Sequence, residues 1–309
     1  MVAILDGLIP IAAAIFLGWS IRRSGLIRAE LWGGITRLSY VALLPALLFA
    51  TIAEAGVGEL AAGRFILAAV IGFSAMAALA VALKPLLMTD GPSFTSVFQG
   101  AVRWNGFVIL ALAQASLTPA QVALTALVFA PTVPLINVLC VAALSIWGEN
   151  DEHIRLGRVL FRVVSNPLII GCLLGAAAGT SPVLRPPLVI ETAELLGRAA
   201  LPLILLTVGA GLDFTSVRAR PRLLSVAVAL KMIAAPAVFL GLGHALGLPG
   251  DALVVLTMVG AAPGAASSYV LARELGGNAE LTAGHVTVTT VLAFLTLPLW
   301  VNVVGPPGG

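Results

Sequence analysis

The sequence has few charged residues. Asp, Glu, Lys and Arg make up 10% of the 309 residues, whereas hydrophobic residues make up 60%. A soluble domain carries about one quarter charged residues, so this composition excludes an ordinary soluble protein and predicts one that crosses a lipid bilayer several times. The net charge of +3 then reflects orientation in the membrane, and no nucleic-acid partner is implied.

Cysteines and catalytic motifs are also scarce. The two cysteines, Cys140 and Cys172, lie in apolar stretches without ligand spacing around them, which argues against a disulfide framework and a metal site. The chain contains no nucleotide-binding loop, no HExxH pattern and no nucleophile elbow. We therefore expect neither an enzyme nor a resident cofactor.

Acidic residues are absent from the middle of the apolar stretches. All 14 Asp and Glu residues fall in loops or in the outer turns of these stretches. Carriers of protons or cations that are built on broken helices usually hold the ion with buried acids. The absence disfavours a cation as the main cargo and favours an anion.

Ten apolar stretches are long enough to cross a bilayer, which takes about twenty residues of helix. They lie at about 3–21, 36–53, 64–84, 95–115, 121–147, 164–180, 190–211, 222–246, 252–272 and 281–303. The sequence therefore predicts an all-α polytopic membrane protein with ten spans, which are numbered one to ten in chain order.

The chain repeats itself at about half its length. Pro10 and Gly18 in span one recur as Pro167 and Gly175 in span six, and such a fixed offset indicates two copies of one structural unit. Each copy has five spans. Because five is an odd number, the second copy enters the membrane from the opposite side, so we predict two inverted five-helix repeats.

The basic residues predict the orientation. With the N-terminus outside, the inner loops hold twelve of the 17 Lys and Arg residues and the outer loops hold three. The positive-inside rule then places both termini on the outer side of the cell (inner) membrane. The predicted parts are a first five-helix repeat over 1–148, a cytoplasmic linker over 149–162 and a second repeat over 163–305.

Span four has the most polar interior of the ten. An arginine near mid-bilayer, here Arg103, costs roughly 3 kcal/mol even on a lenient scale and needs a partner or water. Two interpretations stay open, and both can hold: Arg103 caps carbonyls at the end of a half-helix, or it attracts an anionic substrate. We expect the helix to break at Asn105 and Gly106, since Gly tolerates any backbone angle and Asn can cap the next helix.

Span nine has a second candidate break at the corresponding position, formed by Ala262, Pro263, Gly264 and Ala265. Proline suits the first turn of a new half-helix, although an ordinary kink in a packed helix is the alternative. Two broken helices at related positions would bring two positive helix N-termini to the midplane. Together they would form an anion site from backbone alone.

Other polar residues lie inside the spans. Asn137 in span five either lines the site or bridges helices. For Ser267 and Ser268, a bond to their own helix or a packing role is the alternative to ligand contact. Lys231 is expected to snorkel or to pair locally. His285 is expected to hydrogen-bond locally, with a proton relay as the weaker alternative.

Several motifs resemble those of the auxin efflux carrier family of membrane transporters. They are Leu17-Gly18 with Arg22-Arg23, LPALLF at 44–49, NPLII at 166–170 through Gly175, Ala262-Pro263 through Ser267-Ser268 and Ala272, and LPLW at 297–300. The resemblance covers nearly the whole chain. One departure lies in span four, where Leu112 stands in the place of a proline that often follows Arg-x-Asn in the family.

This resemblance implies a ten-helix fold in which broken helices four and nine cross, similar to bile-acid symporters and sodium/proton antiporters. Helices 1, 2, 6 and 7 would form a scaffold that pairs into a homodimer, and helices 3–5 and 8–10 a mobile transport domain. The family's cargo is organic anion, such as auxin in plants and malonate or related carboxylates in bacterial members. The short central loop resembles the bacterial type.

We therefore expect a secondary transporter or facilitator of small organic anions that works by alternating access. The expected substrate-binding residues are Arg103, Asn105, Gly106, Asn137, Pro263, Gly264, Ala265 and Ser267. Coupling to sodium or protons is left open. The alternatives are a sodium-coupled symporter of bile-acid type and a membrane receptor that binds its ligand without moving it.

Overall fold

The chain folds into two compact units. The computed structural model describes residues 2–55, 62–149 and 165–305, and within these ranges every regular element is a helix. Unit 1 consists of Met1–Ala62, Phe107–Pro131 and Phe161–Gly211, and unit 2 of Gly63–Gly106, Thr132–Leu160 and Leu212–Gly309.

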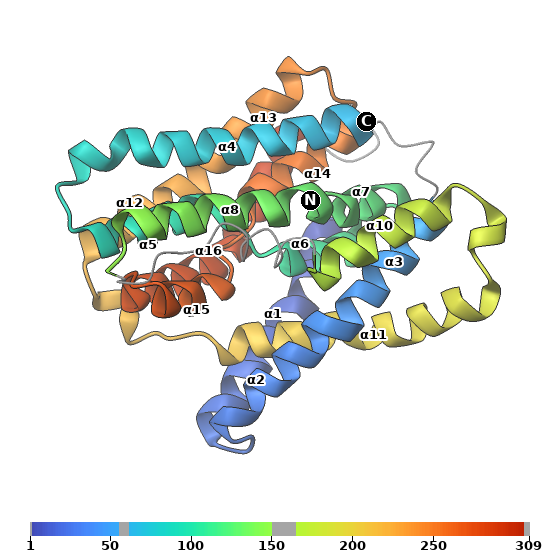
Figure 1. Cartoon of the computed structure of the whole chain (residues 1–309), viewed down its shortest axis with the longest axis horizontal. Coiled ribbons are helices and arrows are strands. Elements are labelled where there is room, and N and C mark those ends of the chain that lie inside the picture. The colour runs from blue at the N-terminus through green and yellow to red at the C-terminus, as the bar shows by residue number, and fades with distance from the viewer. Residues whose placement is uncertain (1, 56–61, 150–164, 306–309) are drawn as a thin grey trace. The chain divides into compact units, whose positions relative to one another are not determined.

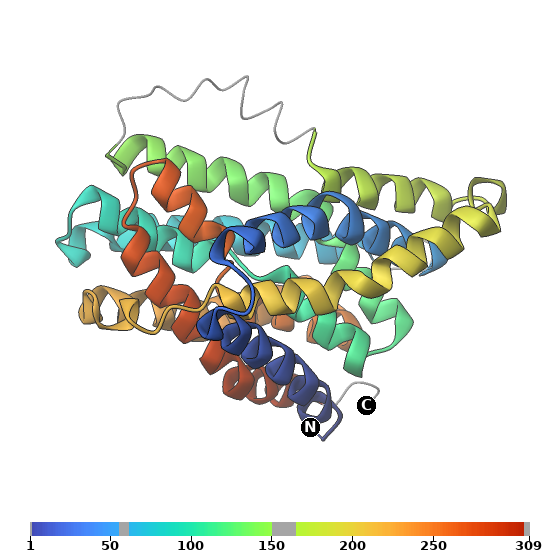
Figure 2. The same cartoon turned by 90° about the horizontal axis from the view of Figure 1, so that it is seen from below.

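Unit 1 is a bundle in which α1 packs against α11, and α3 packs against α10 and α11 (Figures 1 and 2). Its elements are α1 (Val2–Ser24), α2 (Ala29–Leu38), the π-helical turn η1 (Ser39–Leu43), α3 (Leu44–Ala55), α6 (Gly106–Ser116, whose first residue belongs to unit 2), α7 (Pro119–Leu127), α10 (Pro167–Gly179), the 3-10 turn η3 (Pro182–Leu184) and α11 (Pro187–Ala210).

Glycines allow the close approach of α1 and α11. A Cβ on Gly18 would collide with the backbone of Leu206, and one on Gly209 would collide with the backbone of Ile15. Small residues at such crossings let helices gain van der Waals contact where the surrounding lipid gives no hydrophobic driving force. The α1–α11 contact therefore depends on both glycines.

Unit 2 carries the most polar spans. Its elements are α4 (Ala62–Leu87, from Gly63 on), α5 (Gly91–Val102), α8 (Phe129–Trp147, from Thr132 on), the 3-10 turn η4 (Ser216–Arg218), α12 (Pro221–Ala229), the π-helical turn η5 (Leu230–Ala234), α13 (Ala235–Ala245), α14 (Gly250–Ala261), α15 (Ser267–Glu274) and α16 (Ala279–Val304). α13 packs against α14, and α16 packs against α5, α12 and α14. The rings of Phe73 on α4 and Phe239 on α13 meet edge to face at 4.9 Å.

Two spans contain a wide helical turn that ends two residues before a proline: η1 ends at Leu43 before Pro45 in span two, and η5 ends at Ala234 before Pro236 in span eight. Proline has no N–H to donate to the carbonyl four residues earlier, so the preceding turn can widen to i+5 bonding. The N–H of Leu44 accordingly donates to the Ser39 carbonyl, and that of Ala235 to the Leu230 carbonyl. Both spans continue as helix through these turns.

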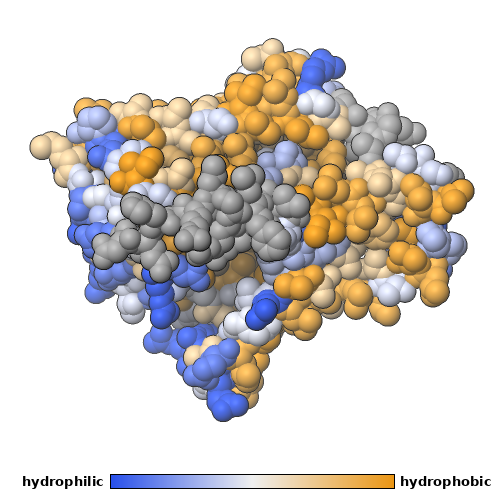
Figure 3. All heavy atoms as spheres, viewed as in Figure 1, coloured by the Kyte–Doolittle hydropathy of each residue, from blue (hydrophilic) through white to orange (hydrophobic). Residues whose placement is uncertain are grey.

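Eight helical stretches in the described ranges are long and apolar enough to cross a membrane. They are Ile4–Ser24, Ala29–Glu54, Ala62–Leu87, Gly91–Ser116, Pro119–Trp147, Pro187–Ala210, Pro221–Ala245 and Ala279–Val304. The shorter apolar helices Pro167–Gly179 and Gly250–Ala261 fall in predicted spans six and nine. Apolar side chains cover much of the face drawn in Figure 3, as lipid-facing helices require.

The prediction of an all-helical protein with several membrane spans is confirmed. The inverted arrangement of two repeats stays a prediction, as do the repeat boundaries. Apart from Glu149, the predicted linker 149–162 lies outside the described residues.

Candidate functional site

Span four is interrupted after α5. The helix ends at Val102, the next three residues are not helical, and α6 begins at Gly106. Arg103 has an extended backbone, with φ −76° and ψ 137°, and its N–H donates to the Gln99 carbonyl to close the last turn. Asn105 is buried, with 3% of its surface exposed.

Span nine is interrupted after α14. The helix ends at Ala261, residues 262–265 are not helical, and α15 begins at Ser267. Ala262 has φ −58° and ψ 142°, because the ring of a following proline disfavours the helical region for the residue before it. Residues Ala262 to Ala265 therefore separate two helices. An ordinary kink, the alternative interpretation, would have left one bent helix.

The two interruptions contact each other within unit 2. The N–H of Asn105 donates to the carbonyl of Pro263 at 2.8 Å, and the buried N–H of Gly264 donates to Thr289 Oγ1 on α16 at 3.0 Å. Backbone groups that lose their helical partners at a break must find others in an apolar interior. These two bonds satisfy part of that need: the first joins the two breaks, and the second ties the span-nine break to α16.

Arg103 is held by two neutral side chains next to this contact. Its Nη1 donates to Asn137 Oδ1 on α8 at 3.0 Å, and its Nη2 donates to Ser267 Oγ at the first residue of α15 at 3.0 Å. The Nε atom has no partner. Because the guanidinium bonds run to side chains of other elements, the structure gives no support to the interpretation that Arg103 caps the carbonyls of α5.

The charge of Arg103 has no acidic partner in the described part of the chain. The ion pairs found there join Arg198 to Glu194 and Arg220 to Asp90. Arg103 is half-buried, and Ser267 beside it is exposed. An uncompensated guanidinium that remains accessible is a site where a carboxylate can form charge-assisted hydrogen bonds.

The predicted site residues all lie in unit 2. Arg103, Asn137 and Ser267 are joined by hydrogen bonds, and Asn105 and Pro263 by their backbones. Gly106 begins α6, and the Ala265 carbonyl accepts from the Ser268 N–H at 3.0 Å. No contact of these last two residues points to a ligand.

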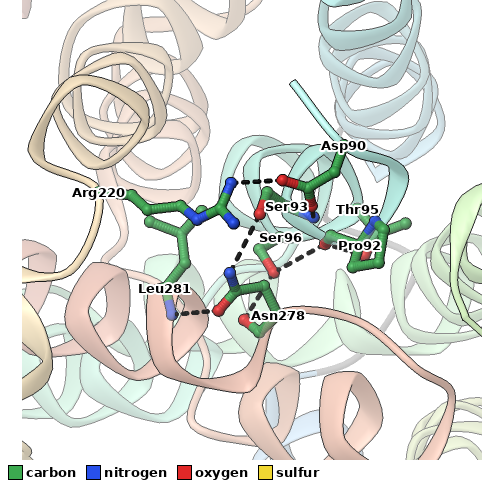
Figure 4. A network of polar contacts seen from close by, with 8 residues as sticks. All are labelled: Asp90, Pro92, Ser93, Thr95, Ser96, Arg220, Asn278 and Leu281. Carbon is green, nitrogen blue, oxygen red and sulfur yellow. Dashed lines mark hydrogen bonds and ion pairs between the residues drawn. The ribbon is translucent and has the colours of Figure 1, made fainter.

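The start of α5 is tied to neighbouring elements by a polar network (Figure 4). Asp90 caps α5 by accepting from the Ser93 N–H at 2.8 Å and pairs with Arg220. Asn278, at the start of α16, donates from Nδ2 to Ser93 Oγ at 3.0 Å, and its carbonyl accepts from Ser96 Oγ at 2.8 Å. These bonds fix the helix that leads into the first interruption.

Asp90 lies outside the spans. Burial raises its pKa, but the hydrogen bonds from Ser93 and the pairing with Arg220 outweigh burial and hold the pKa below its ordinary value. The carboxylate therefore stays ionised at neutral pH.

Sequence reasoning found Lys231 and His285 inside the spans, but it missed that they belong to a second group of buried polar residues in unit 2. The side chains of Gln99, Lys231, His285 and Thr290 are at most 1% exposed, and each has an atom without a hydrogen-bond partner. Lys231 was expected to snorkel or to pair locally; the structure buries it completely and gives its Nζ no partner. Polarity inside an apolar span was the available signal, but the complete burial of these side chains on elements that pack together depends on tertiary structure.

Two comparisons with known proteins bear on this arrangement. Residues 150–301 match the family model described as "Membrane transport protein". A Rhizobium meliloti protein described as "Putative malonate transporter" is 25% identical over 305 residues, which cover 96% of this chain and 94% of the relative. A Methanothermobacter thermautotrophicus protein described as "Uncharacterized transporter" is 28% identical over 105 residues, 34% of this chain and 35% of the relative.

The apolar helices, the paired interruptions and these similarities define a multi-pass membrane transport protein. Within that class, the motifs, the matched family model and the Rhizobium relative support a membrane transporter of the auxin efflux carrier family. Membership in a transporter family is consistent with the expectation that the protein is not an enzyme.

Proposed function

We propose that this protein carries small organic carboxylates across the cell membrane and that Arg103 binds the carboxylate. The observation that carries the proposal is the half-buried guanidinium, held by the neutral Asn137 and Ser267 where two interrupted helices meet, with no acid paired to it in the described ranges. Malonate, the cargo in the name of the Rhizobium relative, is the first substrate to test.

The chemistry of the site suits a carboxylate. A guanidinium offers several N–H donors in a planar fork that matches the two oxygens of the ligand. Asn137 Oδ1 orients that fork, since it accepts one of its hydrogens. The Ser267 hydroxyl adds a donor at the positive end of the α15 dipole. We assign Asn105 a supporting hydrogen bond to the ligand.

We propose that the ten spans form two inverted five-helix repeats and that spans four and nine cross at their interruptions. Three observations support this: each predicted span contains helix, both breaks fall at the positions that the repeat relates, and the Asn105–Pro263 bond joins them. In this arrangement helices 1, 2, 6 and 7 form a scaffold that dimerises, and both termini lie outside the cell.

All the proposed ligand residues belong to one unit. The cargo would therefore move with unit 2, while spans one, two, six and seven, which lie in unit 1 together with α6 of span four and α7 of span five, stay as the scaffold. Moving a site as one body keeps the hydrogen bonds of Arg103 intact during transport. Alternating access by rigid-body movement of one part against the other then needs no breakage at the site.

The test is uptake of radiolabelled malonate into proteoliposomes. Arg103→Ala should reduce the initial rate at least about tenfold, since a lost charge-assisted pair costs that much or more. Arg198→Ala is the matched control, because Arg198 is an exposed arginine on α11 paired with Glu194, and it should keep the rate within about twofold.

Three further outcomes decide between functions. A folded Arg103→Ala variant with the wild-type rate would overturn the assigned site. Uptake that requires sodium would identify a sodium-coupled symporter, and replacing sodium by potassium tests this. Binding of malonate without counterflow exchange would identify a receptor and overturn transport as the function.

A further inference from the structure

Several buried polar atoms in unit 2 lack a hydrogen-bond partner. Those on fully buried side chains are both amide atoms of Gln99, Nζ of Lys231, Nε2 of His285 and Oγ1 of Thr290. The side chains are fully buried or 1% exposed. Buried polar groups are nearly always bonded, and this need is greater in a membrane protein because the lipid offers no partner. Their shared deficit indicates that something else satisfies them during function.

Three packed elements carry these atoms. Lys231 lies in η5, which packs against α5, the helix of Gln99, and against α16, the helix of His285 and Thr290. The imidazole of His285 lies against Gly100, the neighbour of Gln99: a Cβ at Gly100 would be 3.0 Å from Nε2. The same ring lies against Gly264 in the span-nine interruption. The cluster is therefore next to the candidate site, and it shares α5 with it.

Lys231 has no acid near it in the described structure. The elements that pack against η5 are α5, α12, α13, α14 and α16, and the acids on them are at their outer ends: Asp251 in the first turn of α14 and Glu280 in the first turn of α16. From α16, His285 is the titratable group that faces the cluster. The ring of Phe73 on α4 lies 6.0 Å from Lys231 Nζ.

An ammonium group buried at this depth is strongly disfavoured without a counter-charge. Ionisable residues inside spans usually mark the path of a charged substrate. The interior of unit 2 contains two cationic side chains, Arg103 and Lys231, and the described residues supply no carboxylate to either. An anion that enters unit 2 would supply the missing charge.

We propose that Lys231, together with the amide of Gln99, binds a negatively charged group inside unit 2 at a position separate from the one that Arg103 holds. The ligand is a small anion that accepts hydrogen bonds: either the second carboxylate of the cargo or an inorganic anion such as chloride. The assignment to a second carboxylate of the cargo rests on the proposed function, whereas the assignment to an inorganic anion does not.

The chain offers a matched control for this position. Lysine occurs only twice, as Lys84 and Lys231. Lys84 lies near the end of α4, with its Nζ 5.6 Å from the Phe94 ring and 5.8 Å from the Trp147 ring. Lys84→Met and Lys231→Met therefore make the same chemical change in two surroundings.

The experiment measures binding of malonate, acetate and chloride to purified protein in nanodiscs, in a chloride-free HEPES–Tris buffer. If the ligand is the second carboxylate of the cargo, Lys231→Met weakens malonate binding by about tenfold or more and leaves acetate binding within about twofold. Lys231→Arg retains most of the malonate affinity, Gln99→Met shows a smaller loss, and Lys84→Met matches the wild type.

If the ligand is inorganic, chloride raises the Tm of the wild type and of Lys84→Met but leaves that of Lys231→Met unchanged.

Other results would overturn one proposal and leave the second in place. A folded Lys231→Met variant that binds malonate and responds to chloride like the wild type removes the Lys231 site. A wild type that binds no carboxylate, yet shows the Lys231-dependent chloride response, removes the proposed function and keeps the anion site. Where Lys231→Met does not fold, Gln99→Met decides: unchanged malonate and chloride responses in that variant count against the site.

Discussion

The two units differ in what their interiors contain. Of the buried polar and charged side chains in the described structure, five belong to unit 1 and fifteen to unit 2. Those of unit 1 are Ser39, Gln121, Thr125, Asn166 and Thr207. Those of unit 2 include the fully buried Lys231 and the Thr, Ser and Asn residues around both interruptions. The buried interior of unit 1 is therefore largely apolar, whereas unit 2 contains most of the buried polar groups.

The difference predicts which kind of substitution destabilises each unit most. In unit 1, close helix contact depends on residues without a side chain, such as Gly18 and Gly209. In unit 2, the interruptions depend on individual hydrogen bonds that replace lost helical ones. Added volume should therefore damage unit 1 most, and lost hydroxyl or charge should damage unit 2 most.

The largest effect is expected from Gly209→Leu in unit 1. The new side chain would collide with the Ile15 backbone, which cannot move without separating α1 from α11, and the loss of stability should be about 3 kcal/mol or more. Gly34→Leu is the control, because a Cβ at Gly34 meets no atom within 4 Å. Thermal unfolding and size-exclusion profiles measure both. A Gly209→Leu protein as stable as the control would contradict the crossing.

A smaller loss is expected from Thr289→Val in unit 2. The change leaves the buried N–H of Gly264 without its acceptor, which costs about 1–3 kcal/mol, and it should also slow malonate uptake. Thr257→Val is the comparison, since the Thr257 hydroxyl bonds to the Leu253 carbonyl of its own helix. Denaturant unfolding and uptake are the readouts. Equal behaviour of the two variants would show that the Gly264 bond is dispensable.

Ser267→Ala should weaken malonate binding and lower stability by no more than the contribution of one hydrogen bond. It removes one of the two hydrogen bonds to Arg103, and one such bond is worth about 0.5–1.5 kcal/mol, or about two- to tenfold in Kd. Ser268→Ala tests the neighbouring hydroxyl, to which we assign no contact with Arg103. Calorimetric titration with malonate measures both. An unchanged Kd for Ser267→Ala would argue against Ser267 as a site residue.

The smallest effect concerns Asp90 and pH. Its folded-state pKa is lowered, so its contribution to stability is present above the unfolded-state pKa and is lost as the pH falls through the folded-state pKa. Because the Asp90–Arg220 pair is partly exposed, the contribution should be about 1 kcal/mol or less. Asp90→Asn should lower the Tm at pH 7 and converge with the wild type in acid. A Tm difference that is the same at both pH values would contradict the linkage.

Much of the architecture could be predicted from the sequence. Apolar runs of twenty residues have few alternatives to membrane helix, so every predicted span contains helix. The break in span nine follows from Pro263, which constrains both itself and Ala262. The break in span four was expected at Asn105 and Gly106. Its non-helical residues begin earlier, at the extended Arg103. The break is present although Leu112 occupies the position at which the family often has a proline.

The partners of the polar residues could not be predicted. Arg103 reaches Asn137 and Ser267 across 34 and 164 residues of sequence, and no local pattern encodes such a distance. The complete burial of Lys231 escaped prediction for the same reason. A lysine in a regular helix can reach an interface along its own axis, and only packing against several elements prevents this.

The wide turn at η5 has a consequence for how this chain should be aligned with its relatives. A π-helical turn accommodates more residues per turn than an α-helix, so it can absorb an insertion without moving the two ends of the span. Relatives that lack a proline at the position of Pro236 would then be expected to be one residue shorter in span eight. An alignment without a gap there would pair Lys231 with a residue from a different side of the relative's helix. The residue that corresponds to Lys231 in space would then be missed.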